Sequence, residues 1–64
     1  MTAKDIIKIL EDHGFRLIRI EGSHHIYAKK GHPRSISIPV HGKKEIKYFS
    51  TILRQAGIDP KDIR

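Results

Sequence analysis

Apolar side chains recur at helical spacing near the start of the sequence and again toward its end. The first apolar face consists of Ile6, Ile7, Ile9 and Leu10. Thr2 is a residue type that caps helices, Asp5 follows three positions later as in a capping box, and Gly14 suits the position after a helix. The pattern therefore predicts a first helix over residues 2–13.

The second apolar face at helical spacing consists of Ile46, Phe49, Ile52, Leu53 and Ala56. Gly57 follows it directly and is a residue type that ends helices. Asp59 and Pro60 then have the types expected for the cap and first residue of a further short helical turn. We therefore expect a second helix that includes Ile46 and ends at Gly57, followed by one more turn.

Between the helices, three segments have the composition or alternation of strands. Residues 15–20 are rich in β-formers, residues 24–29 follow a Gly-Ser turn, and residues 35–39 alternate strictly and end in proline. In the first segment, a period of two separates Phe15, Leu17 and Arg19 from Arg16, Ile18 and Ile20. We expect both faces of this strand to be partly covered, and the alternation leaves open which face points inward.

The predicted order α-β-β-β-α is that of a two-layer α+β fold. Three consecutive strands joined by short turns form an antiparallel meander, and both apolar helix faces need the same sheet face for burial. The opposite sheet face is then left to solvent or to a partner. A chain of 64 residues has room for one domain, residues 1–64. It contains no cysteine, no long apolar run and no signal-peptide pattern, so we expect a soluble, cytoplasmic protein.

The charge balance favours an anionic partner. Thirteen Lys and Arg residues against seven Asp and Glu leave a formal charge of +6. Such a field attracts nucleic acid. From composition alone, a charge that only keeps the protein soluble is an equally good explanation. The basic residues that flank the third strand are Lys29, Lys30, Arg34, Lys43, Lys44 and Lys47. We interpret them as a phosphate-binding track on RNA, the alternative being solvated turn residues. Tyr27 is a candidate for base stacking, although packing is the commoner role of a strand tyrosine.

Histidine is the residue type in this chain best suited to proton transfer near neutral pH. Gly22 and Ser23 form a turn that delivers His24 to the first position of the second strand, with His25 on the opposite face. His24 is therefore the candidate general acid or base, against the alternative of a structural histidine. His41 is the second candidate, equally well explained by local hydrogen bonds.

The remaining histidines are interpreted as structural, namely His13 at the end of the first helix, His25 and His32. The spacing of all five histidines lacks the pairing of metal ligands. The sequence therefore predicts no metal site and no cofactor.

Three motifs, taken together and in order, resemble the HicA toxin family. They are Gly22-Ser23-His24-His25-Ile26-Tyr27, then Ile38-Pro39-Val40-His41, and Ile52-Leu53-Arg54-Gln55-Ala56-Gly57-Ile58. The resemblance covers nearly the whole chain. It implies a fold like that of double-stranded-RNA-binding domains, a small ribonuclease or mRNA interferase, and inhibition by a HicB antitoxin. The family's catalytic histidine falls on His24, its glycine and serine on Gly22 and Ser23, and a recurrent histidine on His41.

One departure from the family pattern concerns the second helix. Residues 47–50, Lys-Tyr-Phe-Ser, stand where relatives commonly have a Pro-Gly or similar pair and a threonine, and the segment is apparently two residues shorter. The helix start is therefore left open.

The leading functional hypothesis is a toxin ribonuclease, monomeric alone and bound by an acidic antitoxin. A rival is a non-catalytic RNA-binding module in which His24 only contacts phosphate. A pure protein-interaction domain explains the charge poorly.

Overall fold

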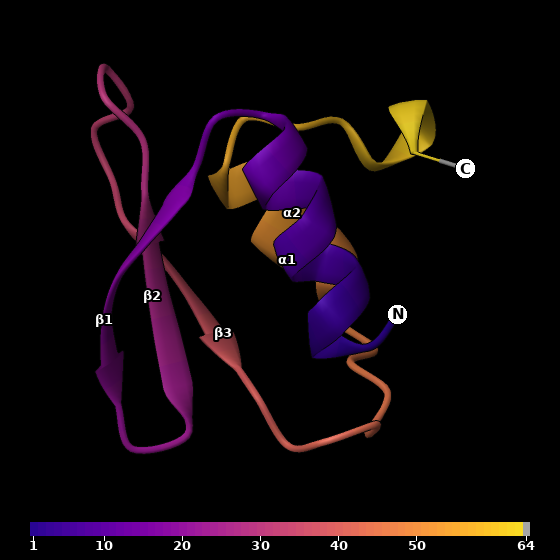
Figure 1. The fold of residues 1–64 in the computed structure, drawn as a ribbon. Coiled ribbons are helices and arrows are strands. Elements are labelled where there is room, and N and C mark those ends of the chain that lie inside the picture. The colour runs from indigo at the N-terminus through magenta and orange to yellow at the C-terminus, as the bar shows by residue number, and fades with distance from the viewer. Residues whose placement is uncertain (64) are drawn as a thin grey trace.

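Three antiparallel strands and two α-helices build the fold of the computed structural model, which describes residues 1–63. Helix α1 spans Ala3–Asp12, and strands β1, β2 and β3 span Arg16–Glu21, His24–Ala28 and Ile36–Pro39. Helix α2 spans Phe49–Gln55, and a 3₁₀ turn spans Pro60–Asp62. The sheet order is β1-β2-β3, with both helices on one side of it (Figure 1). The predicted α+β class and element order are confirmed.

The two helices bury the face of the sheet that β2 and β3 present to them. Their least exposed core side chains are Ile6 and Leu10 from α1, Ile36 and Ile38 from β3, and Leu53 from α2. Tyr27 is only 3% exposed within the same core, and burial raises the pKa of its hydroxyl. Base stacking by Tyr27 is therefore excluded, and packing is its role.

Helix α1 begins at the capping box that its sequence predicts. The Thr2 hydroxyl accepts the Asp5 N–H at 3.3 Å, and the Asp5 carboxylate accepts the Thr2 N–H at 3.0 Å. The bond from the Thr2 backbone lowers the pKa of the Asp5 carboxyl, with a further contribution from the Thr2 side chain. At the other end, His13 Nδ1–H donates to the Ile9 carbonyl at 2.8 Å, so this histidine serves the helix terminus as expected.

Helix α2 is shorter than the apolar pattern predicts. Ile46 is buried, but it lies in the loop before the helix and its N–H donates to the Met1 carbonyl at 2.6 Å. Its neighbour Glu45 forms an isolated antiparallel bridge with Thr2. Pairing with the start of the chain therefore holds residues 45–46 in an extended conformation, which is not helical, and α2 starts only at Phe49. After it, the predicted turn is present, with the Asp59 carboxylate accepting the Lys61 N–H at 2.9 Å.

Strand β1 contradicts the predicted alternation. A bulge at Ile18 shifts the register, so Leu17 pairs with Tyr27 but Arg19 pairs with Ile26. Arg19 therefore leaves the face of Leu17, which is shared instead by Ile20. All six residues of β1 are exposed, so the expected partial cover of both faces is wrong. The cause is that α1 and α2 pack on β3 and β2, and the free edge strand lies beyond them.

Within the described residues, no helix has both the length and the apolar character that crossing a membrane requires.

Candidate active site

A two-residue turn places His24 at the entrance of β2. Glu21 and His24 are the last paired residues of β1 and β2, which leaves Gly22 and Ser23 as the loop. Gly22 has φ +61°, and a left-handed residue at the first loop position is typical of a type II′ hairpin turn. A Cβ at Gly22 would meet open space among residues 1–63. The backbone conformation, and not lack of room, therefore favours glycine here.

The imidazole of His24 lies on the open face of the sheet, opposite to the helices. His24 pairs with Pro39, while its neighbour His25 pairs with Ile38 of the core. His24 is exposed, and its Nδ1 lies 3.2 Å from the Ser37 hydroxyl. Its Nε2 makes no hydrogen bond to any described residue. The ring is therefore anchored by one nitrogen and presents the other to solvent.

The adjacent histidines are separated by the sheet, as the period of two predicts. His25 is half-buried on the helix side, between Ile20 of β1 and Ile38 of β3. The two rings therefore point to opposite faces and do not share a ligand.

Two polar side chains near His24 were not found from the sequence. Ser37 lies on the polar side of the third strand's alternation, but only the strand register brings it beside His24. Arg19 pairs with Ile26 and Glu21 with His24, so both lie on the open face, where the Arg19 Nε bonds the Glu21 carboxylate. The bulge decides the position of Arg19, and simple alternation gave the wrong face.

The loop after β3 lies at the same end of the sheet as His24. The Val40 N–H donates to the Ser23 carbonyl at 2.7 Å, which ties this loop to the active-site turn. His41 is exposed and borders a hollow of about 230 Å³. The hollow is lined by Pro39, His41, Lys44, Glu45, Ile46 and Tyr48. A basic and aromatic surface therefore adjoins Pro39, the residue paired with His24.

The predicted basic track is divided between the two ends of β3. His41, Lys43, Lys44 and Lys47 lie in the loop that follows the strand, at the His24 end. Lys29, Lys30 and Arg34 lie in the β2–β3 loop at the other end of the sheet (Figure 1). In the sequence, all these residues flank β3. In the structure, only the first group lies at the His24 end of the sheet.

Part of the β2–β3 loop has a structural role. His32 Nε2–H donates to the Gln55 carbonyl at 2.8 Å and meets the Phe15 ring edge-on, with 5.3 Å between centroids. The Lys29 ammonium lies 5.7 Å from the centroid of the same Phe15 ring. His32 is thus structural, as predicted, and Lys29 contributes to packing as well as to charge.

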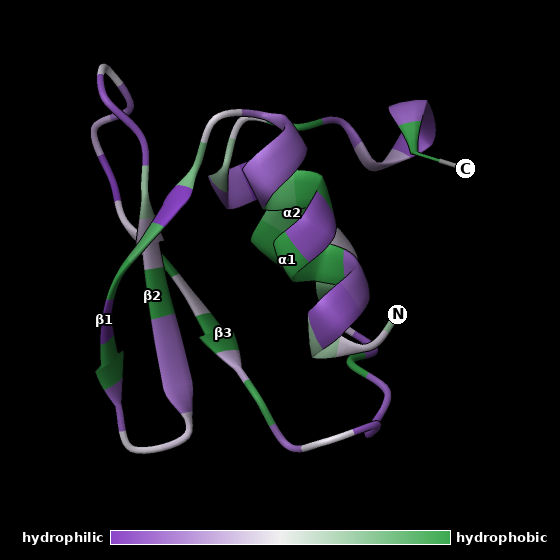
Figure 2. Ribbon diagram, in the orientation of Figure 1, coloured by the Kyte–Doolittle hydropathy of each residue, from purple (hydrophilic) through white to green (hydrophobic). Residues whose placement is uncertain are grey.

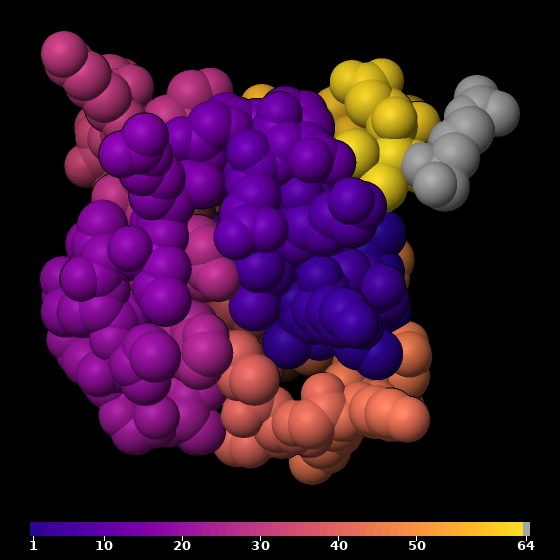
Figure 3. All heavy atoms as spheres, in the orientation of Figure 1, coloured from indigo at the N-terminus to yellow at the C-terminus, as the bar shows by residue number. Residues whose placement is uncertain are grey.

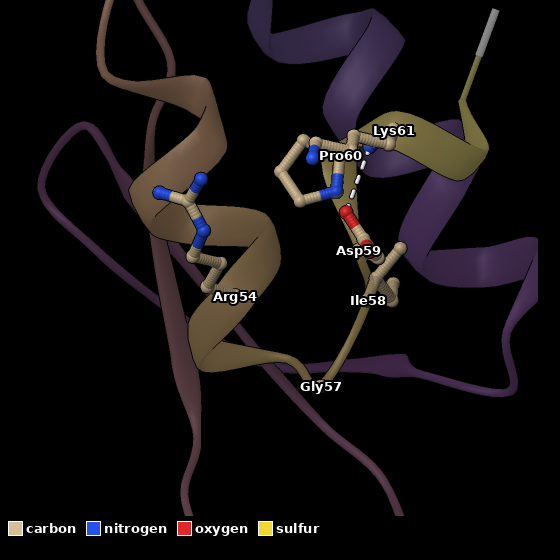
Figure 4. A pocket seen from close by; sticks show the side chains of 6 residues that line it. All are labelled: Arg54, Gly57, Ile58, Asp59, Pro60 and Lys61. Atoms are coloured by element: carbon tan, nitrogen blue, oxygen red, sulfur yellow. Dashed lines mark hydrogen bonds between the residues drawn. The ribbon is translucent and has the colours of Figure 1, made fainter.

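Another hollow lies away from His24. It has a volume of about 400 Å³ and is lined by Arg54, Gly57, Ile58, Asp59, Pro60 and Lys61 (Figure 4). These residues lie in and after the last turn of α2, which His32 joins to the β2–β3 loop. This hollow therefore belongs to the opposite end of the molecule from the active-site turn.

No group of three His, Cys, Asp or Glu side chains among residues 1–63 is close enough together to hold a metal ion. Proton transfer by His24 and charge from Lys and Arg are the chemistry that these residues offer.

Comparisons with known proteins bear on the family and the fold of the chain. The family model described as HicA toxin of bacterial toxin–antitoxin systems matches residues 3–58. Among solved structures, a chain of a toxin–antitoxin complex from Streptococcus pneumoniae is 37% identical in sequence, with a TM-score of 0.74. The match covers 91% of this chain and 98% of that chain. A comparison with curated protein sequences finds no match.

Proposed function

The chain belongs to the HicA toxin family of bacterial toxin–antitoxin systems, and from this premise we propose that it is a metal-independent endoribonuclease inhibited by a HicB-type antitoxin. The observation that carries the ribonuclease proposal is the exposed His24, held at Nδ1 by Ser37 with Nε2 facing outward. A histidine presented in this way on an open face is accessible to a polymer substrate such as messenger RNA.

The reaction uses the 2′-hydroxyl of RNA as its nucleophile. A base removes the proton of this hydroxyl, the oxygen attacks the adjacent phosphorus, and the bond from phosphorus to the 5′ oxygen breaks. The leaving oxygen takes a proton from an acid, and the products carry a 2′,3′-cyclic phosphate and a 5′-hydroxyl. His24 Nε2 is the group that takes or gives the proton.

Ser37 suits a histidine that has to change its protonation state. A hydroxyl both donates and accepts hydrogen bonds, so it holds Nδ1 whether or not that nitrogen carries a proton. The ring orientation is then the same before and after proton transfer. Ser37 is a positioning residue, because it acts on the reaction through His24.

Cations near His24 stabilise the negative charge that develops on the phosphate. Arg19 lies on the same sheet face and is held by Glu21, and the loop after β3 adds His41, Lys43, Lys44 and Lys47. The RNA backbone follows this end of the sheet. The basic residues at the other end of the sheet are Lys29, Lys30 and Arg34. They bind only phosphates that flank the part of the RNA beside His24.

The test of the ribonuclease proposal compares the two neighbouring histidines. The variant His24→Ala is expected to cleave RNA about 10²–10⁴-fold more slowly than wild type, the usual contribution of general acid–base catalysis. The matched control His25→Ala, on the opposite face, keeps its activity. Cleavage by wild type is also expected to persist in excess EDTA. Wild-type rates in His24→Ala, or activity lost to EDTA and restored by a divalent ion, contradict the proposal.

The rival function, a non-catalytic RNA-binding module, is favoured by the same basic surface. It is distinguished by turnover, since a binding module shifts RNA in a gel but leaves it intact.

A further inference from the structure

Strand β1 carries an apolar surface that the fold leaves uncovered. Leu17, Ile18 and Ile20 are 45%, 50% and 56% exposed, three large apolar side chains within a strand of six residues. Figure 2 shows green, hydrophobic segments along β1. Contiguous apolar surface on a small, highly charged protein marks an interaction site.

The bulge concentrates part of this surface on one face. Leu17 pairs with the core residue Tyr27, and Ile20 pairs with His25, so both side chains lie on the helix side of the sheet. In a regular strand, two residues three positions apart would lie on opposite faces. We call Leu17 and Ile20 the overhang, because the helices cover β2 and β3 and stop short of β1. In Figure 3, β1 forms the border of the molecule beyond the atoms of α1.

We propose that the overhang is the anchoring surface for an acidic protein partner, the inhibitor of this toxin. The proposal rests on the proposed function in one respect, that an inhibitory protein exists. The formal charge of +6 attracts an acidic chain and repels a second copy of this one. The bulge also twists the free edge of β1, which opposes continuation of the sheet by another strand. The partner therefore binds the overhang through apolar side chains and not by strand addition.

The position of the overhang relative to His24 explains how such an anchor serves inhibition. His24 lies on the opposite face, in β2, which is the strand next to the free edge. Neighbouring strands are about 4.8 Å apart. A partner that binds the overhang therefore reaches His24 by passing around a single strand. Binding energy comes from one face and occlusion of the active site takes place on the other.

The experiment separates inhibition from RNA cleavage. The double variant Leu17→Ser/Ile20→Ser is compared with Leu17→Ile/Ile20→Leu, which keeps the apolar surface. The probe is the purified product of the acidic reading frame adjacent to this gene, and its affinity for each protein is measured by titration calorimetry. We expect the serine variant to bind at least about tenfold more weakly, since buried apolar anchors dominate interfaces. The swap variant binds like wild type, and all three cleave RNA equally.

Three results overturn the proposal. The first is equal affinity of the serine variant and wild type, and the second is no binding of the acidic protein to wild type. The third is a wild-type chain that dimerises in sedimentation while the serine variant stays monomeric, because a second copy then covers the overhang. A wild-type chain that binds through the overhang but cleaves no RNA leaves this inference intact and refutes the ribonuclease.

Discussion

One hydrogen bond orients the imidazole ring of His24. The ring has one protein partner among the described residues, the Ser37 hydroxyl at 3.2 Å, and it is exposed on the open face of the sheet. A carboxylate in place of Ser37 would favour the charged imidazolium, whereas a hydroxyl tolerates both forms. Residue 37 therefore holds the orientation of the ring.

Substitution of Ser37 tests this coupling. Ser37→Ala is expected to cleave RNA roughly tenfold more slowly, because the variant lacks the hydrogen bond that positions the His24 ring. Ser37→Asp is expected to move the pH–rate profile to higher pH, because the carboxylate stabilises the protonated ring. Ser35→Ala, at the residue just before β3, is the matched control and keeps both rate and profile. A profile that is identical in Ser37→Asp and wild type would show that residue 37 does not act through His24.

Among the elements, α1 has the most fully determined boundary. Its capping box satisfies the Thr2 and Asp5 backbone N–H groups with side chains of the same two residues. The folded state lowers the pKa of the Asp5 carboxyl below its ordinary value of 3.8, because the carboxylate accepts the Thr2 N–H. This stabilising contribution is therefore present above that value and is lost as the pH falls through the lowered pKa of the folded state.

Removal of the cap tests the element. Thr2→Ala is expected to lower the free energy of unfolding by about 1 kcal/mol, measured by urea denaturation at neutral pH. Thr51 is exposed inside α2, so Thr51→Ala serves as control, with a change within about 0.5 kcal/mol. An equal loss in both variants would mean that the cap adds nothing beyond ordinary threonine contacts. RNA cleavage is expected to be unchanged in both, because neither residue lies near His24.

On the scale of the whole molecule, the basic residues that contribute to the +6 charge form two separate groups. One basic group lies in the loop after β3, next to the active-site turn, and the other in the β2–β3 loop. Both groups raise the field around the protein and accelerate encounter with RNA. We expect only the first to contact the phosphates that flank the proposed cleavage point.

Matched charge removal distinguishes the two ends. Lys43→Ala and Lys44→Ala each remove one charge near His24, and Lys30→Ala removes one at the far end. We expect the first two to weaken RNA binding at every sequence and to reduce the salt slope of log K by about 1 each. Lys30→Ala is expected to have a smaller effect on both. Equal effects of all three variants, measured by filter binding across salt concentrations, would indicate an RNA path along the whole of β3.

Interactions between residues close in the sequence determine much of this fold. The capping box, the Gly22-Ser23 turn and the alternation of the third strand each depend on neighbouring residues, and each is confirmed. The opposite orientation of His24 and His25 follows from the period of two alone. The α+β order follows too, because two apolar helix faces need one sheet face between them.

Contacts between distant residues decided the rest. The bulge at Ile18 depends on pairing with β2, and it placed Arg19 on the face of His24 and Leu17 and Ile20 together on the other face. The start of α2 depends on residues 1–2, which bind residues 45–46 from the other end of the chain. The sequence by itself therefore identified His24 as the candidate catalytic group, because its turn is local. Only the tertiary structure brought Ser37 to it, since strand register joins residues that are 13 positions apart.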